Sequence, residues 1–268
     1  MLVQVSEHCW VRRSTFCQSN TVVVRGDGGA LLVDPGVTGA ELRALAAELG
    51  RLGLPPVVGF STHPHWDHLL WTPELGDVAR LATADAAAHA RMSLADAREK
   101  AGRLAPGNDL ALLGLLDALP RGAGSVDWEG PEVKVVEHRG HAPGHAALFV
   151  PADGVLIAGD MLSDVEVPLL DLKTGALDPL ADYEHGLDVL EQVMGQGCRV
   201  LVPGHGGVAA DEEVRLRFRA DRTYLDALRR PSPVEDDRLD PAADYGPDWL
   251  IPEHEAQRSW CLAHVREL

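Results

Sequence analysis

The segment His63-Pro64-His65-Trp66-Asp67-His68 follows directly on the apolar run Val57–Thr62, which has the composition of a buried β-strand. Alternate side chains of an extended chain point the same way, so the first two histidines can converge on one ion. The proline between them supports this geometry because it disfavours the helical conformation at the residue before it. The aspartate and the last histidine then need only a tight turn to face a second ion. Four side chains of metal-ligand type within six residues therefore predict a metal site.

Three further candidate ligands each sit at the junction of a predicted strand and a loop. They are His145 in the segment Gly140–His145, Asp160 in Ala158-Gly159-Asp160, and His205 in Pro203-Gly204-His205-Gly206. The glycines beside them let the backbone approach closely and leave room for an ion. Each is weak evidence alone, but together with the first segment they form a coherent set of seven ligands.

This order of motifs, HxHxDH, then His, then Gly-Asp, then Gly-His, resembles the metallo-β-lactamase superfamily. The similarity covers roughly Thr21 to Gly207 and includes the turn Asp34-Pro35-Gly36. It implies an α/β fold, an αββα sandwich with two divalent metal ions at one edge, zinc being expected and iron or manganese the alternatives. The resemblance implies that a first ion is held by His63, His65 and His145 and a second by Asp67, His68 and His205. Asp160 would bridge the two ions, and Asp34 would orient the ligand loop without binding metal.

Two divalent ions lower the pKa of bound water and polarise a carbonyl oxygen, so a hydroxide between them is the expected nucleophile. Asp67 is then the natural catalytic proton acceptor. The resemblance also narrows the reaction, because true β-lactamases carry Cys or Ser where this chain has Asp160, whereas hydroxyacylglutathione hydrolases and acyl-homoserine lactonases carry Asp. We therefore expect hydrolysis of a small carbonyl substrate, which is a lactone, an ester or a thioester. The three lysines form no recognisable basic cluster, which disfavours a glutathione thioester as the substrate but leaves other thioesters open.

Other functions stay open. An iron-dependent oxidoreductase similar to sulfur dioxygenases keeps much of the same motif, and so do β-lactamase-type and phosphodiesterase-type hydrolases. A binding protein that has lost catalysis is disfavoured by the complete set of seven ligands. Nucleases of the same family are disfavoured by the formal net charge of −17, because phosphate binding needs a basic surface.

Tyr183 is a second candidate catalytic residue, since lactonase-like relatives use a tyrosine downstream of the bridging aspartate to bind the substrate carbonyl. The alternative is that Tyr183 belongs to the apolar stripe of a helix, together with Leu180, Leu187 and Leu190. His141 lies in the same loop as His145, and we interpret it as support or packing rather than as a ligand.

The sequence of the remaining chain predicts alternating strands and helices. Residues 21–24 and 30–33 read as a hairpin, Thr38 to Glu41 as a capping box, residues 84–119 as two helices split near Pro106-Gly107, and Asp178 to Gly195 as a capped helix. We divide the chain into one αββα domain, residues 1–210, and a mostly helical C-terminal extension, residues 211–268, packed on the same domain.

Composition limits the partners and the compartment. The N-terminus has no basic start followed by an apolar core, and no long uncharged apolar run exists, so we expect neither a signal peptide nor a membrane span. The four cysteines are scattered without a CxxC pair, which favours reduced thiols in the cytoplasm. We expect a small-molecule substrate, and no nucleic acid or membrane partner. The leucine-rich run 110–116 is open to interpretation as a packed helix, a lid or a contact in a homodimer.

Overall fold

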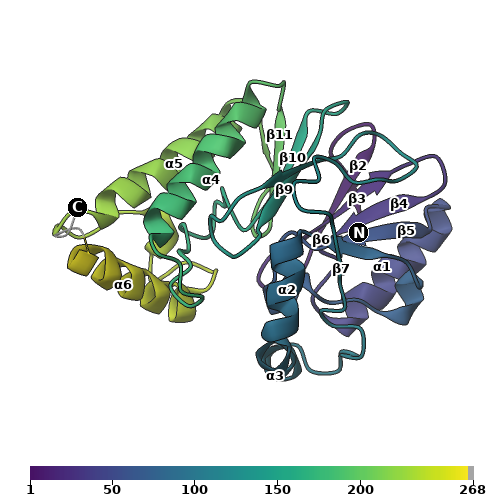
Figure 1. Ribbon diagram of the computed structural model, residues 1–268, viewed down its shortest axis with the longest axis horizontal. Helices are drawn as coiled ribbons and strands as arrows, with labels where there is room; N and C mark the ends of the chain where they lie inside the picture. The colour runs from purple at the N-terminus through teal and green to yellow at the C-terminus, as the bar shows by residue number, and fades with distance from the viewer. Residues whose placement is uncertain (265–268) are drawn as a thin grey trace.

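The computed structural model describes residues 1–264. Two β-sheets face each other, and helices cover the outer face of each, so the chain forms the four layers of an αββα sandwich (Figure 1). Buried apolar side chains of both sheets, such as Val22 and Phe60 from one and Leu148 and Ile157 from the other, fill the space between them. The predicted fold class is confirmed.

The first sheet has seven strands in the order in which they occur along the chain. Its strands are β1 (Val3–Gln4), β2 (Cys9–Arg13), β3 (Asn20–Arg25), β4 (Ala30–Val33), β5 (Pro56–Phe60), β6 (Arg80–Ala82) and β7 (Asp117–Ala118). Strands β1 to β4 pair antiparallel, and β4 to β7 pair parallel. Because β4 and β5 are parallel neighbours, the residues that follow them emerge at the same edge.

The second sheet has five strands in the order β12-β11-β10-β9-β8. Its strands are β8 (Lys134–Glu137), β9 (Ala146–Val150), β10 (Val155–Gly159), β11 (Val200–Pro203) and β12 (Ala209–Ala210). Strands β10 and β11 are parallel, so the segments that follow them also leave the sheet at one edge. Every residue of β9 and β10 is buried, as expected for central strands covered on both faces.

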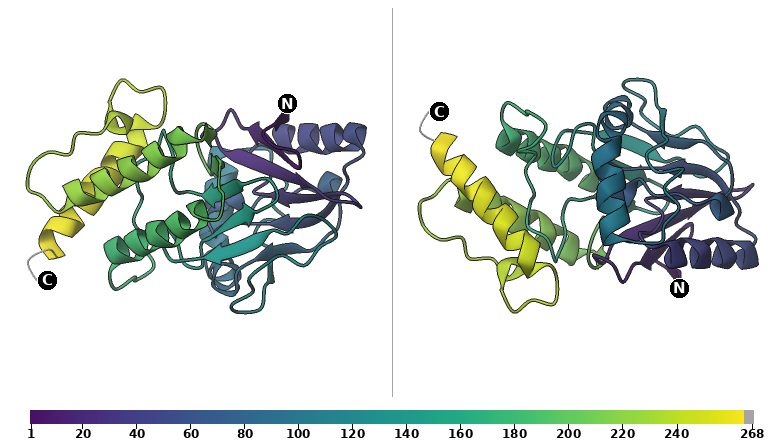
Figure 2. Two further views of the ribbon diagram at one scale, coloured as in Figure 1. Left: turned by 90° about the horizontal axis from the view of Figure 1, so that it is seen from above. Right: turned by 90° about the horizontal axis from the view of Figure 1, so that it is seen from below.

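Within residues 1–264 there are six α-helices. They are α1 (Gly39–Leu52), α2 (Ala84–Met92), α3 (Leu94–Leu104), α4 (Pro179–Met194), α5 (Glu212–Leu228) and α6 (Pro247–His264). Figure 2 shows α1, α2 and α3 against the first sheet and α4 and α5 against the second, with α6 lying on α5. The capping box of α1 and the Asp178 cap of α4 both form as predicted.

The C-terminal extension packs through an apolar face. Phe218 and Leu228 of α5 and Leu250 and Cys261 of α6 belong to the same buried cluster as Leu187 of α4. The last four residues of the predicted extension, 265–268, lie outside the described residues. No helix in the described part of the chain is both long and apolar enough to span a bilayer.

The region between β6 and β7 differs from the prediction. The two helices are split at Ser93, whose backbone N–H and hydroxyl both donate to the carbonyl oxygen of His89. The second helix ends at Leu104, before Pro106-Gly107, and the leucine-rich run 110–116 forms turns rather than a helix. A proline followed by Gly107 at a φ of 88° stops the helix there.

Candidate metal centre

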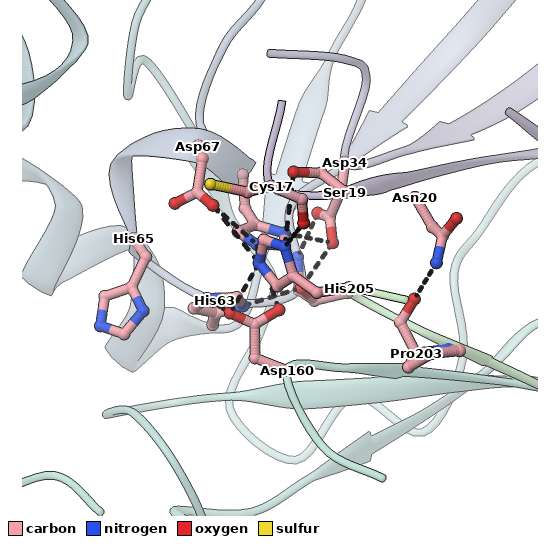
Figure 3. Close-up of polar contacts among 12 residues, drawn as sticks. Cys17, Ser19, Asn20, Asp34, His63, His65, Asp67, Asp160, Pro203 and His205 are labelled. Atoms are coloured by element: carbon pink, nitrogen blue, oxygen red, sulfur yellow. Dashed lines mark hydrogen bonds and ion pairs between the residues drawn. The ribbon is translucent and has the colours of Figure 1, made fainter. Parts of the chain in front are cut away.

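The two sheets meet at the edge where the predicted ligands lie. The backbone N–H of Asn20 donates to the carbonyl oxygen of Gly204 at 2.7 Å, and the Asn20 side chain donates to Pro203 at 2.9 Å (Figure 3). These contacts join the start of β3 to the end of β11. They bring the loop after β5 opposite the loops after β10 and β11, so ligands far apart in sequence become neighbours.

Four side chains form one group of ligand atoms: His63, His65, His141 and Asp160. His65 Nδ1 lies 3.0 Å from His141 Nε2, and Asp160 Oδ2 lies 3.2 Å from His63 Nε2 and 3.5 Å from His141 Nε2. Donor atoms about 2.0–2.2 Å from a tetrahedral zinc ion stand roughly 3.3 Å apart. The spacing of this group therefore suits one divalent ion.

A second group consists of Asp67, His68 and His205. Asp67 Oδ2 lies 3.5 Å from His68 Nε2 and 3.4 Å from His205 Nε2, and the two imidazole nitrogens are 3.3 Å apart. The carboxylate of Asp160 faces this group too, with Oδ1 3.2 Å from His68 Nε2 and Oδ2 3.3 Å from His205 Nε2. Asp160 thus stands between the two groups, where a bridging ligand belongs (Figure 3).

The outward-facing nitrogens of the histidines bind other parts of the chain. The Nδ1 contacts are His63 to Thr62 Oγ1 at 3.0 Å, His68 to Asp34 Oδ2 at 2.9 Å, His141 to the Leu169 carbonyl at 3.2 Å and His205 to the Cys17 carbonyl at 2.7 Å. A histidine that donates from Nδ1 presents the lone pair of Nε2, and such partners fix the plane of the ring. Asp34 therefore orients a ligand without belonging to either group, as the resemblance implied.

The donor set fits divalent ions. His63 Nε2 and Asp160 Oδ1 are buried and have no hydrogen-bond partner within the described residues. His63 Nε2 lies 3.2 Å from Asp160 Oδ2, and His68 Nε2 lies 3.2 Å from Asp160 Oδ1. Imidazole lone pairs beside carboxylate oxygens in a buried site are unfavourable unless a cation lies between them. Imidazole nitrogens and carboxylate oxygens suit zinc, iron and manganese. These side chains could hold two ions, with Asp160 shared between them.

His145 lies outside the first group, and the structure places His141 there instead. Nε2 of His145 accepts the backbone N–H of Asp160 at 3.2 Å, and Nδ1 lies 3.2 Å from Nε2 of His138. Both ring nitrogens are therefore engaged, and the ring is fully buried behind the ligands. His141 has a φ of 77°, which turns its side chain toward His65. We therefore propose His141 as a ligand of the first group, and the metal-binding role expected of His145 stays a prediction.

Tyr183 lies on the buried face of α4, in the cluster that includes Met161 and Leu187. Its side chain has 1% of its surface exposed, and burial raises its pKa well above the ordinary value. This environment matches the apolar-stripe interpretation. Contact between Tyr183 and a substrate stays a prediction.

Glu166, which the sequence did not single out, lies next to the second group and forms a further cluster of possible ligand atoms with Asp160 and His205. It is buried, and its Oε1 lies 3.9 Å from His205 Nδ1 and accepts a hydrogen bond from the hydroxyl of Tyr245. Burial raises the pKa of Glu166 to about 7. The thiol of Cys17 points toward Asp67 in the same region (Figure 3). No local motif marks Glu166, because its partner Tyr245 lies 79 positions away in the sequence.

Charge pairing sets the ionisation of the second group. Burial alone would raise the pKa of Asp67, but attraction to His68 and His205 outweighs it and the pKa is lowered. Burial would likewise lower the pKa of His68 and His205, whereas Asp160 and the other carboxylates raise both well above the ordinary value. The carboxylates therefore attract positive charge to this group, either as protons on the two histidines or as a cation that displaces them.

A family model described as the metallo-beta-lactamase superfamily matches residues 14–205. Among solved structures, a beta-lactamase domain protein from Burkholderia ambifaria superposes with a TM-score of 0.69 at 23% identity, covering 99% of this chain and 88% of that one. A metallo-beta-lactamase family protein from Thermus thermophilus superposes with a TM-score of 0.66 at 24% identity, covering 97% and 93%. At these identities the likeness concerns the fold.

One similar curated protein is an atrochrysone carboxyl ACP thioesterase from Aspergillus novofumigatus. It is 26% identical over 110 residues, which cover 39% of this chain and 31% of that protein. The chain therefore matches about a third of the length of that relative.

Proposed function

The chain belongs to the metallo-beta-lactamase superfamily, and we propose that it is a dinuclear metal-dependent hydrolase of a small thioester, ester or lactone. The observation that carries this proposal is the convergence of two groups of ligand atoms, with the carboxylate of Asp160 facing both. Buried atoms without partners, His63 Nε2 and Asp160 Oδ1, support it further. We propose zinc as the expected metal, with iron and manganese as alternatives, and the cytoplasm as the compartment.

Two divalent ions, when bound, make water acidic enough to lose a proton near neutral pH and polarise the oxygen of a carbonyl. The chain's own residues then have separate tasks. Asp160 contributes negative charge to both groups, and the outer hydrogen bonds of the histidines keep their inner nitrogens directed at the centre. Attraction to His68 and His205 keeps the carboxylate of Asp67 ionised. We propose Asp67 as the group that accepts the proton of the nucleophile.

Two observations support an acyl substrate. The resemblance associates Asp at the position of Asp160 with thioester and lactone hydrolysis rather than with β-lactam cleavage. The Aspergillus relative is a thioesterase. A formal net charge of −17 disfavours nucleic acid. We therefore propose a small thioester as the first substrate class, with lactones and other esters as the alternatives.

Metal analysis and a substrate panel test the proposal. Protein purified without added metal is analysed by mass spectrometry of its elements, then assayed on thioesters, lactones, phosphodiesters and β-lactams with zinc or manganese added. We expect about two ions per chain and the fastest turnover on a thioester or lactone. Asp160→Ala and His65→Ala should each lose metal and activity, whereas Arg229→Met should keep both, because the side-chain partners of Arg229 are Glu184 and Asp226.

Metal analysis combined with an assay of oxygen uptake tests the alternative that the protein is an iron-dependent oxidoreductase. Near-stoichiometric iron together with thiol-dependent oxygen uptake would contradict the hydrolase proposal and favour an oxidoreductase. Full activity of Asp160→Ala protein after chelation would contradict the proposed site.

A further inference from the structure

The segment between Asp160 and α4 begins with an irregular loop, Met161–Leu172, which we call the post-Asp160 loop. It contains no helix or strand, and Leu162 has a φ of 62°. Despite this irregular backbone, most of the loop is buried, including Ser163 and Glu166. A buried loop without a strand partner needs other hydrogen bonds for its backbone groups.

The C-terminal extension supplies those hydrogen bonds. Arg238 Nη1 donates to the carbonyl oxygens of Ser163 at 3.2 Å and Glu166 at 3.0 Å. The remaining contacts are Gln257 Nε2 to the Pro168 carbonyl at 2.8 Å, the Leu170 N–H to Gln257 Oε1 at 3.0 Å, the Leu162 N–H to Asp221 Oδ2 at 3.1 Å and the Tyr245 hydroxyl to the Glu166 carboxylate. The extension thus contacts the loop along most of its length.

The opposite side of the same loop contacts two proposed ligands. The hydroxyl of Ser163 donates to the carbonyl oxygen of His205 at 2.9 Å. The carbonyl oxygen of Leu169 lies 3.2 Å from Nδ1 of His141 and accepts its proton. His141 belongs to the first group of ligand atoms and His205 to the second. One loop therefore connects the extension to both groups.

We propose that the C-terminal extension is a positioning element of the metal centre, which fixes His141 and His205 through the post-Asp160 loop. This inference rests on the proposed function, because it concerns the affinity of the same site for its ions. The residues that transmit the effect are Arg238, Gln257 and Tyr245, and none of them belongs to either group of ligand atoms.

Arg238 is suited to this task by its shape and its charge. Its side chain is 6% exposed and forms ion pairs with Asp221 at 2.6 Å and Asp236 at 2.8 Å. The pair of aspartates balances the buried charge, and the planar fork directs Nη1 at two loop carbonyls at once. A lysine at this position keeps the charge but cannot make the same set of hydrogen bonds.

Gln257→Met is the sharpest test, because methionine has a similar length but removes both hydrogen bonds to the loop. Tyr245→Phe and Arg238→Lys are the companion variants. Arg229→Met is the matched control, since Arg229 joins the extension to Glu184 of α4 at 2.7 and 2.8 Å without touching the loop. Zinc affinity is measured by competition with a chromophoric chelator, and the visible spectrum of the cobalt(II)-loaded protein reports ligand geometry.

We expect Gln257→Met and Arg238→Lys to bind zinc about tenfold more weakly than the wild type and to show an altered cobalt spectrum. Tyr245→Phe should show a smaller change in the same direction. Arg229→Met should keep the wild-type affinity and spectrum even where its thermal midpoint falls. Should Arg238→Lys fail to fold, the other two variants decide the question.

Wild-type affinity and spectrum in both Gln257→Met and Tyr245→Phe would overturn the inference while leaving the proposed function intact. An equal loss of affinity in Arg229→Met would overturn it as well, because a general loss of stability would then explain the effect. A wild-type protein that binds no ion would overturn the proposed function, and the inference with it.

Discussion

His141 and His145 occupy the same loop before β9 but have opposite environments. His141 Nε2 faces His65 and Asp160, with its outer nitrogen on a backbone carbonyl. His145 uses both ring nitrogens inside the protein, one of them as acceptor for the backbone N–H of Asp160. The first arrangement leaves a lone pair for an ion, and the second holds the backbone of the bridging residue in place.

This contrast gives a prediction at the residue scale. His141→Ala should lose about one of the two ions and at least a hundredfold of activity, because the first group then lacks a ligand. His145→Asn can still accept a hydrogen bond, so it should keep both ions while its free energy of unfolding falls by about 1 to 3 kcal/mol. Metal content, turnover and denaturant unfolding of the two variants decide between the assignments. Loss of an ion in His145→Asn but not in His141→Ala would instead support His145 as the ligand of the first group.

Local sequence could indicate only part of this site. The segment from His63 to His68 follows a strand, so its alternation and its proline predict convergence directly. The choice between His141 and His145 depends on a positive φ at His141, which a histidine seldom adopts and which no neighbouring residue demands. Glu166 and Tyr245 were missed because their contact depends on how the extension packs, which local patterns do not encode.

Glycines at the ends of strands leave the space that the side chains of the proposed centre fill. A Cβ placed on Gly204 would lie 1.9 Å from Oδ1 of Asp160, and one on Gly159 would lie 2.4 Å from Nε2 of His145. Both contacts are far shorter than real Cβ contacts. The Gly-Asp and Gly-His pairs after β10 and β11 are thus steric requirements of the centre as well as motifs.

Gly204→Ala should therefore displace the carboxylate of Asp160. We expect loss of metal and a fall in activity of at least a hundredfold, with a drop in stability because the new Cβ also lies 3.0 Å from the backbone carbon of Gly159. Gly50→Ala in α1 is the control, because a Cβ there meets nothing within 4 Å and should leave activity unchanged. Normal metal content in Gly204→Ala would show that Asp160 can move without consequence.

Asp153, in the turn between β9 and β10, joins the second sheet to the segment before β2. Its carboxylate accepts hydrogen bonds from the hydroxyl of Ser6, the backbone N–H of His8 at 2.7 Å and the His8 ring at 2.7 Å. Burial alone would raise the pKa of Asp153, but these hydrogen bonds outweigh it and lower the pKa. Because the pKa is lower in the folded state, the ionised carboxylate stabilises the protein at pH values above the unfolded-state pKa of about 3.9. This stabilisation is lost as the pH falls through the folded-state pKa.

Asp153→Asn should accordingly cost about 1 to 2 kcal/mol at pH 7. The difference from wild type should shrink as the pH falls below about 4, because the wild-type carboxylate then takes up a proton. Urea unfolding of both proteins across this pH range measures the effect. A difference that does not change with pH would show that shape, not charge, accounts for the contact.

Elements with strong local signals agree with the sequence prediction, and short edge elements do not. The hairpin of β3 and β4 and the capped helices α1 and α4 each have turn or capping residues of their own. Strands β1, β7 and β12 have two residues each and exist only because a neighbouring strand is present to pair with them. Their short segments contain too little periodicity to be recognised.

The proposed ligands come from both halves of the molecule, so bound ions should hold the halves together. The first sheet contributes the segment from His63 to His68, and the second contributes Asp160 and His205 at its strand ends. Binding that is specific for the folded state stabilises it by about 4 kcal/mol at a thousand times the dissociation constant.

Removing the metal with a chelator should consequently lower the thermal midpoint by roughly 10 °C, and adding zinc back should restore it. Differential scanning calorimetry measures the change, with Asp160→Ala protein as the control that should not respond to chelator. A midpoint that is the same with and without metal would contradict a site between the halves.

The order of the ligands along the chain also has a consequence for biosynthesis. His68 and His205 face each other in the centre, yet they are 137 positions apart. At roughly 5 to 20 residues per second, a ribosome needs about 7 to 27 s to produce the second histidine after the first. During that interval the nascent chain has only part of the proposed ligand set. The proposed centre can be completed only after His205 has been synthesised, so full metal loading cannot precede that point of translation.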